Sequence, residues 1–268
     1  MTSVLIPELS VEQRSASLAE TYHFADFTRG NYRKLLRLAK QSYVFGSYVN
    51  AHTDADDDQY SVLWRHDVDY SVHSARALAQ IEHEEGIRAT YFFRLHSELY
   101  NLLEHPVTEL ARAIVRLGHD VGLHLDTTYY DITSADALHD IVAWESSILE
   151  RIVERPVSAF SFHQPTPFLL GCQHETYGGR INTYAARFQG EVGYVSDSNG
   201  YWRHRRLETV LRDATDRHLQ VLTHPVWWTD DVMSPAARIE RCIGGRAESM
   251  RRYYREDMHR AGRINVGA

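Results

Sequence analysis

The sequence predicts an α/β protein in which helices cover a mainly parallel sheet. Three observations lead to this prediction. From residue 60 onward, short runs rich in β-branched and aromatic residues alternate with longer segments of helical periodicity. The chain has 268 residues, a length that suits one α/β barrel or two average domains. Histidine and aspartate gather at the ends of the β-rich runs, where parallel folds place their chemistry.

Residues 1–59 are expected to form an N-terminal extension packed on the main body, which comprises residues 60–268. The extension contains a predicted amphipathic helix over 28–45, because Tyr32 and the leucines that follow it recur at near-helical spacing. The acidic stretch 51–60 predicts a solvated loop, since it lacks the glycine and the distal glutamate of a calcium-binding loop.

The main body opens with a strand, a helix and a second strand. The run 60–66 is short and β-rich, so it predicts the first strand. The segment 71–86 predicts a helix that has Ser71 as its N-cap and Gly86 as its stop. The run 87–95 predicts the second strand.

The same rhythm continues to the end of the chain. The segment 106–118 predicts a helix, because Pro106 lies in its first turn and Gly118 at its end. The remaining predicted strands are 119–126, 157–162 and 219–224. The remaining predicted helices are 134–154 and 234–260, and a break in the second of these at Gly244-Gly245 is left open.

Composition excludes several classes of function. Lysine and arginine number 29 against 36 acidic residues, so the net charge of −7 does not favour a nucleic-acid binder. The two cysteines, Cys172 and Cys242, form no CxxC pair, which excludes a thiolate zinc site and a disulfide framework. No apolar run approaches the ~18 residues of a membrane span, and no signal peptide is evident, so a cytoplasmic protein is expected. Sixteen histidines point to metal or proton chemistry.

Four predicted strands end in histidine or aspartate. Their sequences are RHDVD at 65–69, HDVGLHLD at 119–126, FHQP at 162–165 and THP at 223–225. Because the carboxyl ends of parallel strands meet at one rim, these side chains are expected to lie together. A single histidine at a strand end is more often a satisfied polar residue, but four such ends favour a functional site.

Strand periodicity pairs residues within these ends. Asp67 and Asp69 are two residues apart and share a face, as do His124 and Asp126. Two carboxylates on one face repel each other unless a cation or a proton lies between them. Carboxylate and imidazole ligands suit zinc and similar ions, and metal-assisted hydrolysis also needs a base, an acid and an open position for water. The residues that can fill these roles are Asp67, Asp69, His124, His163 and His224.

The dipeptide His-Asp, which occurs at 66–67 and at 119–120, raises an alternative. A metal phosphohydrolase of the HD type uses such a pair. Those sites lie on helices of all-helical domains, whereas both pairs here fall on predicted strands. The HD interpretation is therefore the weaker one.

Together these segments resemble the polysaccharide deacetylase family, carbohydrate esterase family 4. The matching segments are RHDVDYS, TYFFRL, LGHDVGLHLD, SFHQP, YVSDSNGYWR and LTHPVWW, and they cover roughly residues 60–230. The helix and acidic loop at the start resemble a branch of sugar deacetylases found near surface-glycan gene clusters. The resemblance implies a distorted (β/α)7 barrel. It also implies removal of an N- or O-acetyl group from a sugar with the help of a divalent metal, for which zinc is the expected ion.

The resemblance also implies roles for individual residues. Asp67 would be the general base and Asp69 a metal ligand, while His224 matches the family's late histidine, a general acid. His124 matches the first metal-binding histidine. The family's second metal-binding histidine, four residues further on, is Thr128 here, so a third ligand must come from elsewhere.

Two residues are candidates for that third ligand, His163 and Asp126, and His163 is preferred. His163 stands where the family carries an arginine that orients the base, so it is expected to lie near Asp67. His119 is expected to be structural, because it lies on the opposite face of its strand from His124.

Three further residues are expected to bind substrate: Asp197, Arg203 and Trp227. The first two lie in a segment, 194–203, that is read as a loop and that family members use to support the base and shape the substrate groove. An ordinary structural turn is the alternative. Trp227 follows His224 and predicts either a platform for sugar stacking or a hydrophobic plug, with the plug favoured because tryptophan buries a large area.

The expected function is a metal-dependent hydrolase that removes an N-acetyl group from a small sugar or a glycan precursor. The missing second histidine keeps open a deformylase or a metal-free amide hydrolase on the same fold. A non-catalytic sugar-binding relative is the third alternative. No nucleic-acid partner and no membrane span are expected, and a homo-oligomer is left open.

Overall fold

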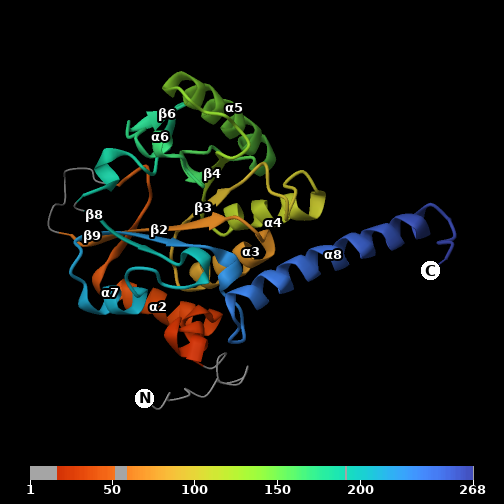
Figure 1. Cartoon of the computed structure of the whole chain (residues 1–268), viewed down its shortest axis with the longest axis horizontal. Coiled ribbons are helices and arrows are strands. Elements are labelled where there is room, and N and C mark those ends of the chain that lie inside the picture. The colour runs from red at the N-terminus through yellow and green to blue at the C-terminus, as the bar shows by residue number, and fades with distance from the viewer. Residues whose placement is uncertain (1–16, 52–58, 191, 268) are drawn as a thin grey trace, which may run out of the picture.

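A single curled sheet runs through the protein in the computed structural model, which describes residues 17–51, 59–190 and 192–267 (Figure 1). Its strands are β1 (Val44–Gly46), β2 (Ser61–Val68), β3 (Thr90–Phe93), β4 (Asp120–Asp126), β5 (Ala159–His163), β6 (Thr176–Tyr177), β7 (Arg180–Asn182), β8 (Val192–Ser196) and β9 (His218–Thr223). The order across the sheet is β6-β7-β5-β4-β3-β2-β9-β8, and β1 pairs with the start of β2.

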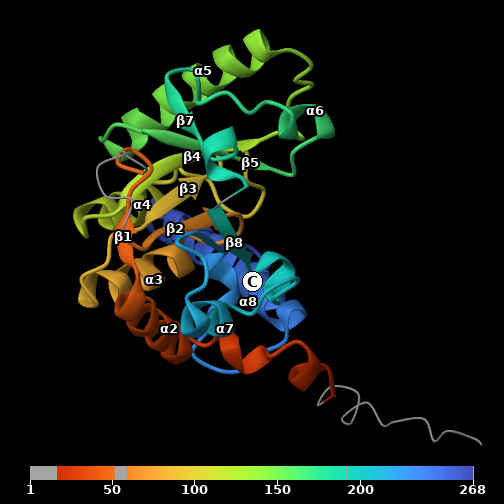
Figure 2. The same cartoon turned by 90° about the vertical axis from the view of Figure 1, so that its left-hand side faces the viewer.

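The seven strands from β7 to β8 along this order are parallel neighbours, and β6 joins β7 in the antiparallel direction. The edge strands β6 and β8 do not pair with each other in the described part of the chain, so the sheet is an open, distorted barrel (Figure 2). The predicted α/β class and the distorted seven-stranded barrel are confirmed.

Most of the helices cover the convex side of the sheet, whereas α8 runs outward from the body (Figure 1). The helices are α2 (Arg29–Ser42), α3 (Val72–Glu84), α4 (His105–Arg116), α5 (Ala135–Val153), α6 (Pro167–Leu170), α7 (Leu207–Asp213) and α8 (Pro235–Arg260). Neighbouring helices α2, α3, α4 and α5 pack side by side along the sheet, as Figure 2 shows. None of the helices in the described ranges combines the length and the hydrophobicity that crossing a bilayer requires.

Local signals begin and end these helices. The Ser71 hydroxyl accepts a hydrogen bond from the Ser74 amide at 3.1 Å, which caps α3. Gly86 and Gly118 adopt positive φ angles of 69° and 93° after α3 and α4, a conformation that glycine adopts without strain. The helix starts and stops expected at these residues are therefore confirmed.

The two faces of each strand meet different surroundings. On β2, Trp64 and Val68 belong to the main hydrophobic core under the helices. Leu63 points to the concave side, where it packs with Phe92 of β3 in a second apolar cluster. This second cluster fills the interior, because a side chain at Gly122 of β4 would place its Cβ 2.3 Å from the Phe92 ring. The barrel interior is a packed core in which Tyr48 donates to Gln220 of β9 at 2.7 Å, and the charged residues of the concave side gather toward the carboxyl ends of the strands.

The N-terminal segment contributes directly to the main body. Helix α2 buries Tyr32, Leu35 and Leu36 in the main core, and β1 extends the sheet beside β2. The expected helix over 28–45 is thus found, ending at Ser42. The predicted loop at 51–60 lies mostly outside the described residues.

The structure adds a strand that was not predicted and decides a point left open. The segment 194–203 begins as the end of strand β8, and Asp197 and Arg203 follow in the expected loop after Ser196. Helix α8 continues through Gly244 and Gly245 without a break. Beyond the neighbouring turns of α8, no described atom lies within 4 Å of the position that a Cβ would take at either glycine. Both glycines therefore lie in open space, where their low helix propensity costs about 1 kcal/mol each relative to alanine.

Candidate metal and acid-base site

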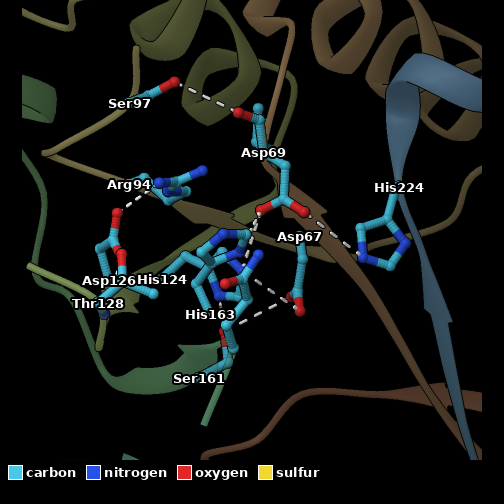
Figure 3. Close-up of polar contacts among 12 residues, drawn as sticks. Asp67, Asp69, Arg94, Ser97, His124, Asp126, Thr128, Ser161, His163 and His224 are labelled. Atoms are coloured by element: carbon cyan, nitrogen blue, oxygen red, sulfur yellow. Dashed lines mark hydrogen bonds and ion pairs between the residues drawn. The ribbon is translucent and has the colours of Figure 1, made fainter. Parts of the chain in front are cut away.

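Five predicted site residues meet on the concave side at the carboxyl ends of four strands (Figure 3). The residues are Asp67 and Asp69 after β2, His124 on β4, His163 at the end of β5 and His224 after β9. The parallel topology explains the meeting, since every one of these strands ends at the same rim.

Asp69, His124 and His163 form the tightest group. The Asp69 Oδ1 atom lies 3.1 Å from His124 Nε2 and 3.1 Å from His163 Nδ1. One potential ligand atom from each of the three residues lies within 4.8 Å of the other two. One carboxylate and two imidazoles are a donor set that zinc accepts in proteins.

Two features of this group fit a divalent cation. Asp69 Oδ1 is buried and makes no hydrogen bond of good geometry, so it is available as a ligand. Burial opposes ionisation of Asp69, but the imidazoles of His124 and His163 hold its pKa well below the usual range. The Asp69 carboxylate is therefore charged, and one nitrogen atom of each imidazole lies close enough to it to bind the same ion.

Ser161 of β5 orients His124. Its hydroxyl lies 2.7 Å from His124 Nδ1 and donates toward Asp67 Oδ1 at 3.5 Å. Because Ser161 donates to Asp67, its oxygen can accept the Nδ1 proton of His124, and Nε2 is then the atom that would bind a cation placed between His124 and Asp69. A fixed tautomer of this kind is typical of metal-binding histidines.

Asp126, the alternative third ligand, is engaged elsewhere. Its carboxylate forms an ion pair with Arg94 and accepts hydrogen bonds from the Thr128 hydroxyl at 2.7 Å and the Thr128 amide at 3.0 Å. Thr128 occupies the position of the family's second histidine and binds Asp126 instead. The structure thus brings His163, and not Asp126, to Asp69.

Asp67 is held by an arginine from its own strand. Arg65 Nη2 lies 2.8 Å from Asp67 Oδ2, and both side chains are buried. Burial raises the pKa of Asp67, but the Arg65 guanidinium, together with His124 and His224, outweighs that effect and lowers the pKa below its ordinary value. The arginine that orients Asp67 therefore comes from position 65, while His163 contacts Asp69.

Arg65 is fixed by the barrel interior. Its guanidinium lies 5.3 Å from the centre of the Phe92 ring and 5.8 Å from that of Tyr184. Arg65 belongs to the RHDVD segment, but no role was predicted for it. Since Arg65 and Asp67 are two residues apart on a strand, the period-2 rule could have placed them on one face.

His224 and Asp197 form a second pair at the rim. His224 Nδ1 lies 2.6 Å from Asp197 Oδ1, and its Nε2 lies 3.8 Å from Asp69 Oδ2. Burial disfavours the charged imidazole, yet the carboxylates of Asp197, Asp69 and Asp67 raise the pKa of His224 to about 9. His224 therefore holds a proton on Nε2 that points to the shared space.

The three expected substrate-binding residues have different surroundings. Asp197 is fully buried, where it also accepts hydrogen bonds from the His224 amide and from Trp228 Nε1. Trp227 is 6% exposed and packs in the main core beside Tyr70, the surroundings expected of a plug. Arg203 is exposed and makes no ion pair with the residues that the structure describes.

A buried polar network lies behind the site on the other face of β2. His66 Nε2 lies 2.6 Å from Glu82 Oε1, and His66 Nδ1 lies 2.6 Å from the Thr223 hydroxyl of β9. Tyr91 of β3 donates to Glu82 Oε2 at 2.6 Å. His119, expected to be structural, contacts the Ala79 carbonyl on this same side. The network ties the strands that carry Asp67 and His224 to α3.

Comparisons with known proteins add the following findings. No family model and no curated protein matches the chain. Several solved structures are similar to it. One is a wild-type pseudoenzyme of the CE4 family from Bacillus anthracis, with a TM-score of 0.43 and 14% identity over 72% of this chain and 62% of that chain. The chain thus spans less than two thirds of that protein.

Two others are esterases. One is a family 4 acetyl xylan esterase from Clostridium thermocellum, in complex with a cobalt ion, at a TM-score of 0.38 and 15% identity over 70% of this chain and 84% of that chain. The other is a family 4 carbohydrate esterase from Streptomyces lividans, in complex with acetate. Its TM-score is 0.40, and its identity is 16% over 70% of this chain and 88% of that chain. The family named by these structures is the one that the sequence segments resemble. The identities and TM-scores are low, so the residues of the site carry the functional argument.

Proposed function

We propose that the protein is a metal-dependent hydrolase of the polysaccharide deacetylase type, which removes an N-acetyl or related acyl group from a sugar or sugar conjugate. One observation carries the proposal. A candidate metal site of Asp69, His124 and His163 lies between a buried carboxylate, Asp67, and a protonated imidazole, His224. Hydrolysis of an amide needs these three components together.

Asp69, His124 and His163 would hold the metal, and zinc is the ion that their donor set favours. A bound divalent ion would polarise the acyl carbonyl and lower the pKa of water at the site. Two imidazoles and one carboxylate leave the open coordination positions that a catalytic ion needs.

Asp67 is the proposed general base. Arg65 fixes its Oδ2 atom, which lies 3.8 Å from His124 Nε2 and has a second lone pair to accept the proton of the attacking water. Arg65 acts through Asp67 as a positioning residue, because its charge keeps the buried carboxylate ionised.

His224 is the proposed general acid. Asp197 holds Nδ1, so the Nε2 proton faces the reacting group and passes to the departing amine. A sugar amine leaves poorly without that proton, so this step decides whether an amide can be cleaved. Asp197 thus positions His224, and Arg203 remains the proposed contact to substrate.

The test measures metal content and released acid on the same samples. Purified protein reconstituted with zinc should bind about one ion and release acetate from at least one member of a panel of N-acetylated sugars. Asp67→Asn should keep the metal and lose turnover, whereas Asp69→Ala should lose both. Formate in place of acetate would make the protein a deformylase. Sugar binding without acid release would contradict a catalytic role.

A further inference from the structure

Helix α8 leaves the body of the protein and runs outward, with the C-terminus beyond its far end (Figure 1). Its 26 residues span about 39 Å. Arg238, near the start, is its one buried residue. From Met250 onward, the side-chain hydrogen bonds, ion pairs and ring contacts involve only residues 248–265 within the described chain.

One face of this outer part is apolar. Ile243, Met250 and Tyr254 are 42%, 58% and 51% exposed and recur at intervals of seven and four residues, so they lie on one side of the helix. Ala247 and Met258 fall on the same side. These five residues form the α8 stripe. An apolar stripe left in water indicates a binding partner.

Arginines border one side of the α8 stripe. At about 100° per residue, Arg251 and Arg255 follow that edge, whereas on the other edge Arg246 pairs with Glu104 of the body at 2.6 Å and Arg260 lies 3.6 Å from Asp257. Residues 241–263 contain seven arginines and three acidic residues, a net charge of +4, although the whole chain carries −7. The partner must therefore be anionic. A second α8 from another copy would set arginine against arginine, which is unfavourable.

Helix α8 starts beside the candidate site. Its first turns pack against the short helix Pro225–Trp227 that follows His224. The Cys242 thiol donates to the Tyr70 carbonyl at 3.4 Å, and Tyr70 follows Asp69. The α8 stripe is therefore joined to the rim, where the acid and the candidate metal ligands lie, through the first turns of the helix.

We propose that α8 is an interfacial helix that docks the protein on an anionic lipid bilayer. The α8 stripe would enter the boundary between headgroups and acyl chains, while Arg251 and Arg255 meet lipid phosphates. A soluble polyanion would satisfy the arginines but leave Ile243, Met250 and Tyr254 in water, so the stripe favours a bilayer. Docking would hold the rim close to a substrate carried by the lipid. This consequence rests on the proposed function, whereas docking itself does not depend on it.

The experiment uses the full chain and sedimentation with vesicles. The protein should bind vesicles of phosphatidylcholine mixed with phosphatidylglycerol, should not bind vesicles of phosphatidylcholine alone, and should dissociate at high salt. Arg251→Gln with Arg255→Gln should weaken partition about 30-fold. The matched control, Arg151→Gln with Arg155→Gln on the outer side of the barrel, makes the same change in net charge and should bind normally. Met250→Ser with Tyr254→Ser should also weaken binding.

Three results would overturn the inference. The first is that the protein does not bind the anionic vesicles. The second is that the control pair loses as much vesicle binding as the Arg251 and Arg255 pair. The third is that the protein does not bind vesicles but self-associates, and that the changes at Met250 and Tyr254 abolish this self-association. Acid release from a water-soluble substrate is measured on the same preparations. It should be unchanged in the α8 variants, so a failure of docking and a failure of the hydrolase are separate outcomes.

Discussion

Replacing Arg65 by methionine removes the positive charge that holds the proposed base and keeps most of the side-chain volume. Arg65 is 1% exposed and Asp67 is 2% exposed, with 2.8 Å between Nη2 and Oδ2. Solvent therefore screens this pair little. Breaking a buried pair in this way costs about 3–5 kcal/mol, because the remaining carboxylate is buried without compensation. We expect Arg65→Met to lose that much stability at pH 7 in urea denaturation.

The pH dependence of this loss follows from the pKa of Asp67. With Arg65 present the folded-state pKa is lowered, so Asp67 stabilises the fold above the unfolded value and this contribution is lost as pH falls through the folded pKa. Without Arg65, the strongest of the groups that lower this pKa is gone, so burial is opposed chiefly by His124 and His224 and the folded-state pKa rises. The stabilising contribution of Asp67 then shrinks, and it is lost at a higher pH as the pH falls. The acidic limb of acid release should move to higher pH.

A double variant and a surface pair supply the controls. Arg65→Met combined with Asp67→Asn should recover much of the lost stability, because no charge is left buried. Arg88→Met breaks the pair with Asp120, in which Arg88 is 60% exposed, and should cost no more than about 1 kcal/mol. If Arg65→Met keeps both its stability and its pH profile, the assigned role of Arg65 is wrong.

Three further predictions follow from other contacts. Asp197→Asn should lower the pKa of His224 from about 9, move the alkaline limb of acid release to lower pH and slow turnover by about 10²–10⁴-fold; an unchanged limb would contradict the role of the pair. Gly122→Ala should destabilise the fold by about 1–3 kcal/mol in urea denaturation, since its Cβ would lie 2.3 Å from the Phe92 ring, and a neutral result would refute the packing of the interior. Removing metal with a chelator should abolish acid release and lower the melting temperature, and zinc at 100 times its Kd should restore about 2.7 kcal/mol; a chelator-resistant activity would favour the metal-free alternative.

The elements that sequence patterns predicted have local causes. The caps at Ser71 and Gly86 and the long periodic helices depend on residues a few positions apart, so one sequence suffices. Strands β6 and β7 are two and three residues long, too short for periodicity to reveal. They flank Gly178 and Gly179, which both have positive φ, and a Gly-Gly pair between short runs is a hairpin signal that could have revealed them.

The candidate site was also predictable in outline, because the strand ends of a parallel fold converge. This rule was enough to predict that Asp67, Asp69, His124, His163 and His224 lie together. The choice between His163 and Asp126 was not predictable, because it depends on the long-range pairing of Arg94 with Asp126. The sequence around Asp126 does not show that its carboxylate pairs with Arg94 and not with a metal ion.

The central claim is that Asp69, His124 and His163 hold one divalent ion. An anomalous difference map at the zinc absorption edge, from crystals grown with zinc, tests it most directly. We expect a single strong peak about 2.0–2.2 Å from His124 Nε2, His163 Nδ1 and an Asp69 oxygen. A map without a peak among these atoms, or with a peak on Asp126 in place of His163, would contradict the claim.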